Sequence, residues 1–95
     1  MTTDFLIDGM LSGTGVRDAL NGGYLQPGGI GLSSSLASDV ADWQRRYEGA
    51  HFANFPEGAV ARLDEEGLAL RSRVQAELPE KRVGYFSNGH MIRLA

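Results

Sequence analysis

The stretch from residue 58 to residue 95 constrains the fold most, because it places an amphipathic helix directly before a strand. Apolar or small residues recur three or four positions apart and therefore share one side of a helix: they are Val60, Leu63, Gly67, Leu70, Val74 and Leu78. Asp64 and Glu65 are assigned to positions off this stripe. Pro79 lacks an N–H and disfavours helical dihedrals in the residue before it, so we expect the helix to end near Leu78.

Residues 83–94 predict a β-hairpin. Asn88-Gly89 is the preferred pair for a two-residue type I′ turn, which would place Ser87 opposite His90. This register pairs Phe86 with Met91 and Tyr85 with Ile92. One face of the hairpin then carries Val83, Tyr85, Ile92 and Leu94, and the other carries Gly84, Phe86, Met91 and Arg93.

The first half of the chain predicts one more long helix and a short strand. The helical stripe consists of Leu36, Val40, Trp43, Tyr47 and Ala50, with serines 33–35 available as caps and an end expected between Glu48 and Ala53. Residues 4–8 predict the strand. Seven glycines lie between Gly9 and Gly29, and within this segment Thr14 is expected to cap a helical turn over residues 16–20.

These elements indicate a single domain over residues 1–95 of the α/β (or α+β) class. We expect a three-stranded sheet, made of the N-terminal strand and the C-terminal hairpin, with two amphipathic helices packed on one face. If the first strand joins residues 82–87 in parallel, the crossover should be right-handed.

Composition excludes several classes of function. The net charge is −3, with nine basic and twelve acidic residues and no basic block, which argues against nucleic-acid binding. The absence of cysteine excludes disulfides, thiolate catalysis and Cys-type metal sites. No apolar run is long enough to span a membrane, and residues 1–10 lack the basic start of a signal peptide, so we expect a cytoplasmic protein.

Several short motifs resemble a group of small uncharacterised bacterial proteins. They are Gly13-Thr14-Gly15-Val16-Arg17-Asp18, Gly23-Tyr24, Trp43-Gln44-Arg45-Arg46-Tyr47, the run 63–70, Glu77-Leu78-Pro79 and Val83-Gly84-Tyr85-Phe86-Ser87. The resemblance spans most of the chain and carries no catalytic motif. It implies a stand-alone bacterial domain without an established activity.

One ligand site can be written down from the residues. Gly13, Thr14, Gly15 and Arg17 would lie between a strand and a helix start, a geometry in which main-chain N–H groups hold phosphate or carboxylate. The P-loop lysine and the full dinucleotide glycine spacing are missing, and the alternative is a Thr-capped turn that needs glycine for its shape.

The sequence contains no motif typical of a catalytic or metal-binding site. His51 and His90 lie far apart and neither has a partner at ligand spacing, so we predict no metal site and no cofactor. Serines 33–35 lack a nucleophile elbow, and adjacent carboxylates on a helix point about 100° apart, so we assign no catalytic residue.

A binding surface for another protein, or for a second copy, is the favoured hypothesis. Leu6, Phe86, Met91 and Arg93 are expected on the sheet face opposite the helices, where uncovered apolar side chains mark partner sites. The glycine-rich segment 9–31 would remove this surface if it folded over it. We therefore expect a non-catalytic interaction module or accessory protein, with anion binding by the Gly13–Arg17 loop as the alternative.

Overall fold

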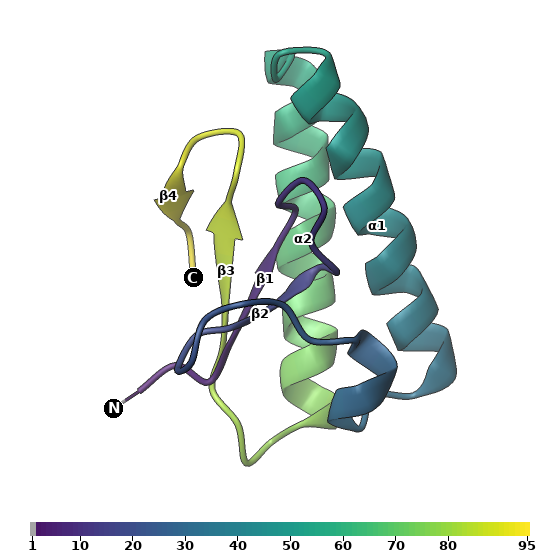
Figure 1. Cartoon of the computed structure of the whole chain (residues 1–95), viewed down its shortest axis with the longest axis vertical. Helices are drawn as coiled ribbons and strands as arrows, with labels where there is room; N and C mark the ends of the chain where they lie inside the picture. The colour runs from purple at the N-terminus through teal and green to yellow at the C-terminus, as the bar shows by residue number, and fades with distance from the viewer. Residues whose placement is uncertain (1) are drawn as a thin grey trace.

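The computed structural model describes residues 2–95, which form a mixed sheet with two long helices on one side of it (Figure 1). The strands are β1 (Phe5–Asp8), β2 (Val16–Asp18), β3 (Val83–Ser87) and β4 (Ile92–Arg93). The helices are α1 (Ser34–Phe52), α2 (Glu57–Glu77) and a 3-10 turn, η1 (Pro27–Ile30). The expected α+β architecture is confirmed.

The sheet has the order β2-β1-β3-β4. β1 and β3 are parallel neighbours at its centre, with Phe5 opposite Val83 and Ile7 opposite Tyr85. β2 and β4 form the two edges and run antiparallel to their neighbours. Because the chain leaves β1 and returns to β3 through both helices, the two central strands come from opposite ends of the sequence.

The two helices lie where the apolar stripes place them. Ser33 caps α1, its Oγ accepting the Leu36 N–H at 3.4 Å, and α2 follows Pro56. Leu78 ends α2, and its N–H donates to the Val74 carbonyl. A short connection makes α1 and α2 an antiparallel pair (Figure 1).

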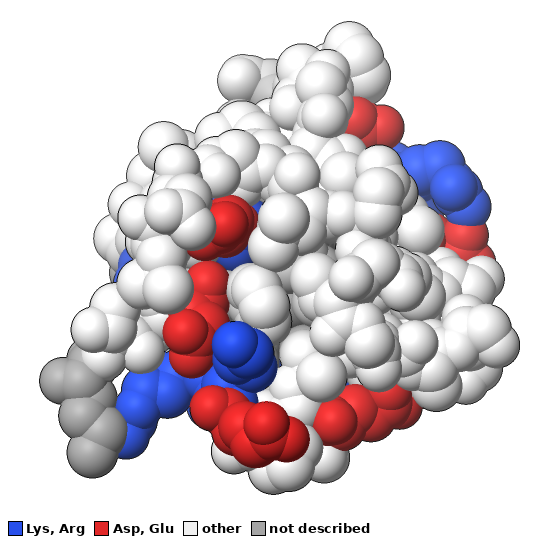
Figure 2. All heavy atoms as spheres, turned by 60° about the horizontal axis from the view of Figure 1, so that its bottom comes forward, with Lys and Arg blue, Asp and Glu red and all other residues white. Residues whose placement is uncertain are grey.

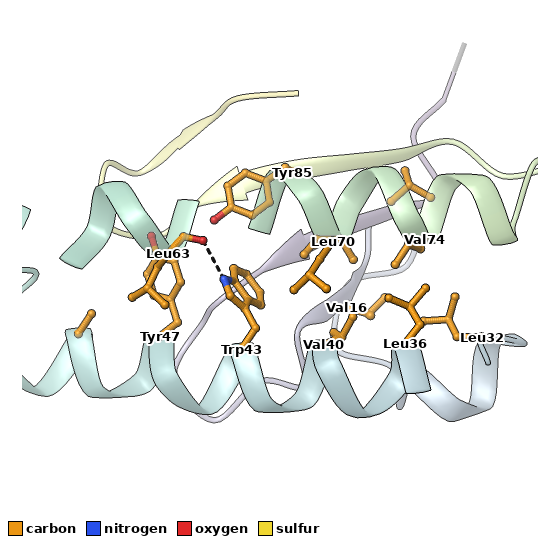
Figure 3. Close-up of a cluster of buried hydrophobic side chains, with 13 residues drawn as sticks. Val16, Leu32, Leu36, Val40, Trp43, Tyr47, Leu63, Leu70, Val74 and Tyr85 are labelled. Carbon is orange, nitrogen blue, oxygen red and sulfur yellow. Dashed lines mark hydrogen bonds between the residues drawn. The ribbon is translucent and has the colours of Figure 1, made fainter. Parts of the chain in front are cut away.

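The core lies between the helices and the sheet (Figure 3). Trp43 is fully buried, its indole N–H donates to the Leu63 carbonyl at 2.8 Å, and its ring lies 5.9 Å from that of Tyr85. Gly67 makes this packing possible, because a Cβ atom there would lie 2.3 Å from the Tyr85 ring. The α2 stripe therefore needs a glycine where helix and sheet approach most closely.

The predicted helical turn at residues 16–20 is wrong, and β2 takes its place. The chain turns at Gly15, whose φ of 96° favours glycine, and Val16 then enters the core with no exposed surface. Thr14 donates its hydroxyl to the Leu25 carbonyl across the loop instead of capping a helix. The sheet consequently has four strands rather than three.

The predicted two-residue hairpin turn is also wrong. Phe86 pairs with Arg93 and Ser87 with Ile92, so four residues connect the strands. Tertiary contacts outweigh the local preference: the Gly89 N–H donates to the Tyr47 hydroxyl at 3.0 Å, and the His90 N–H donates to the Ser87 Oγ at 3.2 Å. The register shifts by two residues, which leaves Ile92 and Arg93 on their predicted faces because the side-chain period of a strand is two, whereas Met91 now lies in the turn.

Across residues 2–95, neither long helix combines the length and apolar character needed to cross a membrane.

Candidate interaction surface

A buried carboxylate, Asp64 of α2, connects both helices to the end of β3. Its Oδ1 accepts the hydroxyls of Tyr47 at 2.9 Å and Tyr85 at 2.6 Å, and its Oδ2 accepts the Ser87 hydroxyl at 2.7 Å. The His90 Nδ1 lies 3.5 Å from the same Oδ2. Burial, together with the bond to Asp64, raises the pKa of Tyr85, so this phenol stays protonated and donates.

The residue types of a Ser-His-Asp triad are present here, but their arrangement is different. The Ser87 hydroxyl donates to the carboxylate, not to an imidazole, and its Oγ accepts the main-chain N–H of His90. Ser87 has no exposed surface that a substrate could reach. This cluster holds the β3–β4 turn in place and contains no activated nucleophile.

A second polar cluster fixes the loop between β1 and β2. The fully buried Asp8 lies 2.7 Å from Arg17 Nη2 and accepts the Tyr24 hydroxyl at 3.2 Å and the Met10 N–H at 3.2 Å. Burial raises the pKa of Asp8, opposed by the Met10 N–H and the Arg17 guanidinium, which favour the ionised form. Arg17 is therefore already paired with a carboxylate of the chain itself.

The loop proposed to bind anions lacks the helix start on which that hypothesis depends. Gly13 packs on the Tyr24 ring, Gly15 packs on Val40, and β2 follows the loop. The Ser12 N–H donates to Glu48 at 2.8 Å, so another carboxylate of the chain takes one of the main-chain donors. The geometry does not favour this loop as a ligand site.

The two histidines lie apart in different contacts. The His51 ring, in the last turn of α1, has its Nε2 2.9 Å from the Gly9 carbonyl oxygen, and His90 lies in the β3–β4 turn near Asp64. Within residues 2–95, no three His, Asp or Glu side chains come together as a metal site.

The four residues expected at a partner surface lie on or beside the sheet face that points away from the helices. Leu6 and Phe86 are half-buried, and the Arg17 guanidinium covers the Phe86 ring at 5.3 Å. Arg93 lies opposite Phe86 and extends over Gly84, with its Nη2 2.7 Å from the Thr3 Oγ1. Met91 lies in the turn and is 65% exposed. Two arginines thus cover much of this face, and the exposed apolar surface lies beside it.

That apolar surface follows one edge of the sheet. Three of the large exposed apolar side chains lie within four residues, namely Met91, Ile92 (53% exposed) and Leu94 (41% exposed). We call residues 91–95 the β4 edge. Ile92 and Leu94 share the helix side of the sheet with Ser87 and Tyr85, yet they lie beyond the surface that the helices cover. The sequence did not indicate that Ile92 and Leu94 are exposed, because it placed them on the same face as Val83 and Tyr85.

The main chain of the β4 edge is also open to a further strand. The Leu94 N–H donates to the Tyr85 carbonyl at 2.9 Å. Because donors and acceptors alternate in direction along an antiparallel strand, the N–H and C=O of Arg93 lie on the outer side. β4 is the last strand in its sheet, so these groups face away from β3.

Charges do not single out a polyanion as the partner. At the end of the molecule that is brought forward in Figure 2, basic and acidic side chains alternate, and neither sign forms a broad patch on the face in view. The net charge of −3 agrees with this distribution.

Comparison with known proteins identifies no relative of this chain. No protein-family model matches the chain, and neither the curated proteins nor the solved structures yield a match. The resemblance to small bacterial proteins gains no support from them. The fold and its surfaces define the chain as a small α+β domain with one apolar sheet edge.

Proposed function

We propose that this chain is a non-catalytic, cytoplasmic protein-interaction module that binds an extended segment of a partner protein along the β4 edge. One observation carries the proposal: the outermost strand has outward main-chain groups, and three large exposed apolar side chains lie in it or directly beside it in the sequence. Strand addition uses both features, since main-chain hydrogen bonds give affinity and alternate side chains give selectivity.

The side chains of the β4 edge define the chemistry of the partner. A strand added beside β4 would place its apolar side chains against Ile92 and Leu94 on the helix side, while a carboxylate on its other face would meet Arg93 once that side chain turns outward from Gly84 and Thr3. Opposite charges directly across a pair of strands are favourable. We therefore expect an extended segment in which an acidic residue is flanked by apolar residues.

A second copy of the chain fits this edge less well. Antiparallel self-pairing of two β4 edges centred on Arg93 would place two arginines directly opposite each other, which is unfavourable. The edge strand has only two residues, so the area available to a symmetric pair is small. The repulsion between the two arginines favours a partner of complementary charge.

The proposal is tested by selecting peptides from a random display library with the whole chain as target. We expect the selected peptides to share an acidic position flanked by apolar ones and to shift the NMR signals of residues 91–95. Ile92→Asp should abolish binding.

The variant Arg93→Pro separates strand addition from simple charge attraction. Proline removes the outward N–H without removing a hydrogen bond to β3, and edge strands tolerate it. Arg93→Ala is the matched control, since it loses the side chain but keeps the N–H. We expect the proline variant to bind much more weakly than the alanine variant. Equal binding by both variants, or a stable dimer in light scattering that Ile92→Asp dissociates, would contradict the proposal.

A further inference from the structure

The same dipeptide, Asn-Gly, occurs at two places in the chain with opposite surroundings. Asn21-Gly22 lies in the turn after β2, where Asn21 is exposed. Asn88-Gly89 lies in the turn between β3 and β4, where Asn88 is 1% exposed. The fold therefore provides an internal comparison for any chemistry that this dipeptide undergoes.

That chemistry is the loss of ammonia from the asparagine side chain. The main-chain nitrogen of the glycine attacks the side-chain carbonyl carbon and forms a five-membered cyclic imide. The glycine nitrogen loses its proton, the bond from the side-chain carbon to Nδ2 breaks, and Nδ2 gains a proton and departs as ammonia. Water then opens the imide at either carbonyl and leaves aspartate or isoaspartate. Glycine favours the attack because it has no Cβ to obstruct the ring and reaches the necessary backbone conformations.

The turn that contains Asn21 leaves room for this ring. Gly22 and Gly23 have φ angles of 80° and 77°, and within residues 2–95 no atom beyond their chain neighbours lies within 4 Å of a Cβ atom built at either position. The bonds that hold the turn are local: the Gly22 N–H donates to the Asp18 carbonyl at 2.9 Å, and Asn21 Nδ2 donates to Asp18 Oδ2 at 3.3 Å. Local bonds in an exposed turn open more readily than tertiary contacts, so a small opening frees the Gly22 nitrogen to attack.

The second dipeptide is held by both long helices. The Gly89 N–H donates to the hydroxyl of Tyr47 in α1 at 3.0 Å, and a Cβ atom at Gly89 would lie 2.4 Å from Val60 in α2. Ring closure at Asn88 therefore requires the β3–β4 turn to leave both helices, which is a much larger opening than the one needed at Asn21.

We propose that Asn21 is a site of spontaneous deamidation in the folded protein and that the fold protects Asn88. The product carries a carboxylate beside Asp18, at the place where the amide of Asn21 was a hydrogen-bond donor to that side chain. The lost donor and the repulsion between two like charges should loosen the turn over residues 18–23.

The test is peptide mapping by mass spectrometry after the whole chain has been incubated in mildly alkaline buffer, with isoaspartate measured separately. In the folded protein we expect Asn21 to convert at least about tenfold faster than Asn88, because only Asn21 reacts through a local opening. In urea the two asparagines should convert at similar rates. Asn21→Gln is the control and should stay unmodified, because the six-membered ring that glutamine would form closes much more slowly.

Three results would overturn this assignment. Equal rates at Asn21 and Asn88 in the folded protein, or a faster rate at Asn88, would show that the fold does not separate the two sites. If Asn21 converts in urea but stays intact in the folded protein, its bonds to Asp18 protect it and no site exists. Asn21→Asp, which reproduces one product, should speed the amide hydrogen exchange of residues 20–25, and unchanged exchange would reject the loosening of the turn.

Discussion

At the scale of single residues, Asp64 accepts hydrogen bonds from three hydroxyl groups that α1 and β3 contribute. Asp64 is only 5% exposed, so water has little access to replace a lost partner. We expect Asp64→Asn to lower the free energy of unfolding by about 3 kcal/mol, because an amide nitrogen cannot accept a hydroxyl and a buried donor loses its acceptor.

Urea unfolding followed by the fluorescence of Trp43, the single tryptophan, measures this loss. Glu65→Gln, at the neighbouring exposed position, is the control and should change stability by no more than about 0.5 kcal/mol. An Asp64→Asn variant as stable as the control would show that the cluster contributes nothing to stability.

Gly67 is the second residue on which the packing depends. A Cβ atom there would lie 2.3 Å from the Tyr85 ring and 2.7 Å from the Trp43 ring. We expect Gly67→Ala to destabilise the protein by about 2 kcal/mol, because overpacking the core outweighs the better helix propensity of alanine. Thermal unfolding measures the change.

Gly49→Ala in α1 is the matched comparison for Gly67→Ala. Nothing lies within 4 Å of a Cβ atom at Gly49, which is exposed and helical. Alanine should therefore stabilise α1 by up to about 1 kcal/mol. The two Gly→Ala changes should therefore alter the free energy of unfolding in opposite directions. A change in the same direction would contradict the close approach of Gly67 to the Tyr85 and Trp43 rings.

At the scale of elements, Glu77 connects the end of α2 to the cap of α1. Its carboxylate accepts the Ser33 N–H at 2.7 Å and the Ser33 hydroxyl at 2.7 Å. These two bonds lower the pKa of Glu77 below its usual value of 4.5. The folded chain therefore binds this proton less readily than the unfolded chain, and the contribution of Glu77 to stability is present above pH 4.5 and lost as the pH falls through the folded pKa.

Unfolding measured between pH 3 and pH 7 checks this direction. Glu77→Gln should lose less stability than the parent protein on acidification, because it has no carboxylate to protonate. Glu80→Gln, an exposed change just beyond the same helix, should follow the parent curve. A Glu77→Gln curve parallel to that of the parent would mean that the contact with Ser33 does not depend on charge.

At the scale of the whole molecule, the periodic spacing of apolar residues correctly predicted the elements that one buried face defines. The stripes containing Trp43 and Val74 predicted both helices, because each stripe must face a core, and Pro79 predicted the end of α2. Asp64 was misassigned although it lies four residues after Val60 and three before Gly67, which places it on the buried face. Asp64 was assigned to the exposed face because it is charged.

The remaining errors lie where distant residues override local preference. Val16 lies in β2 because it pairs with Ile7 and accepts the Leu25 N–H at its carbonyl. The residues next to Val16 in the sequence do not predict this strand. The Asn88-Gly89 turn widens because Tyr47, 42 residues earlier, accepts the Gly89 N–H.

The central position of β1 has a consequence for synthesis of the protein. β1 is synthesised well before its parallel neighbour β3, because β2 and both long helices lie between them in the sequence. Until then Ile7, which is fully buried in the folded chain, has no β3 beside it, and the helical hairpin has only part of a sheet to cover. The central strand pair of the sheet can therefore form only after α1, α2 and β3 have all been synthesised.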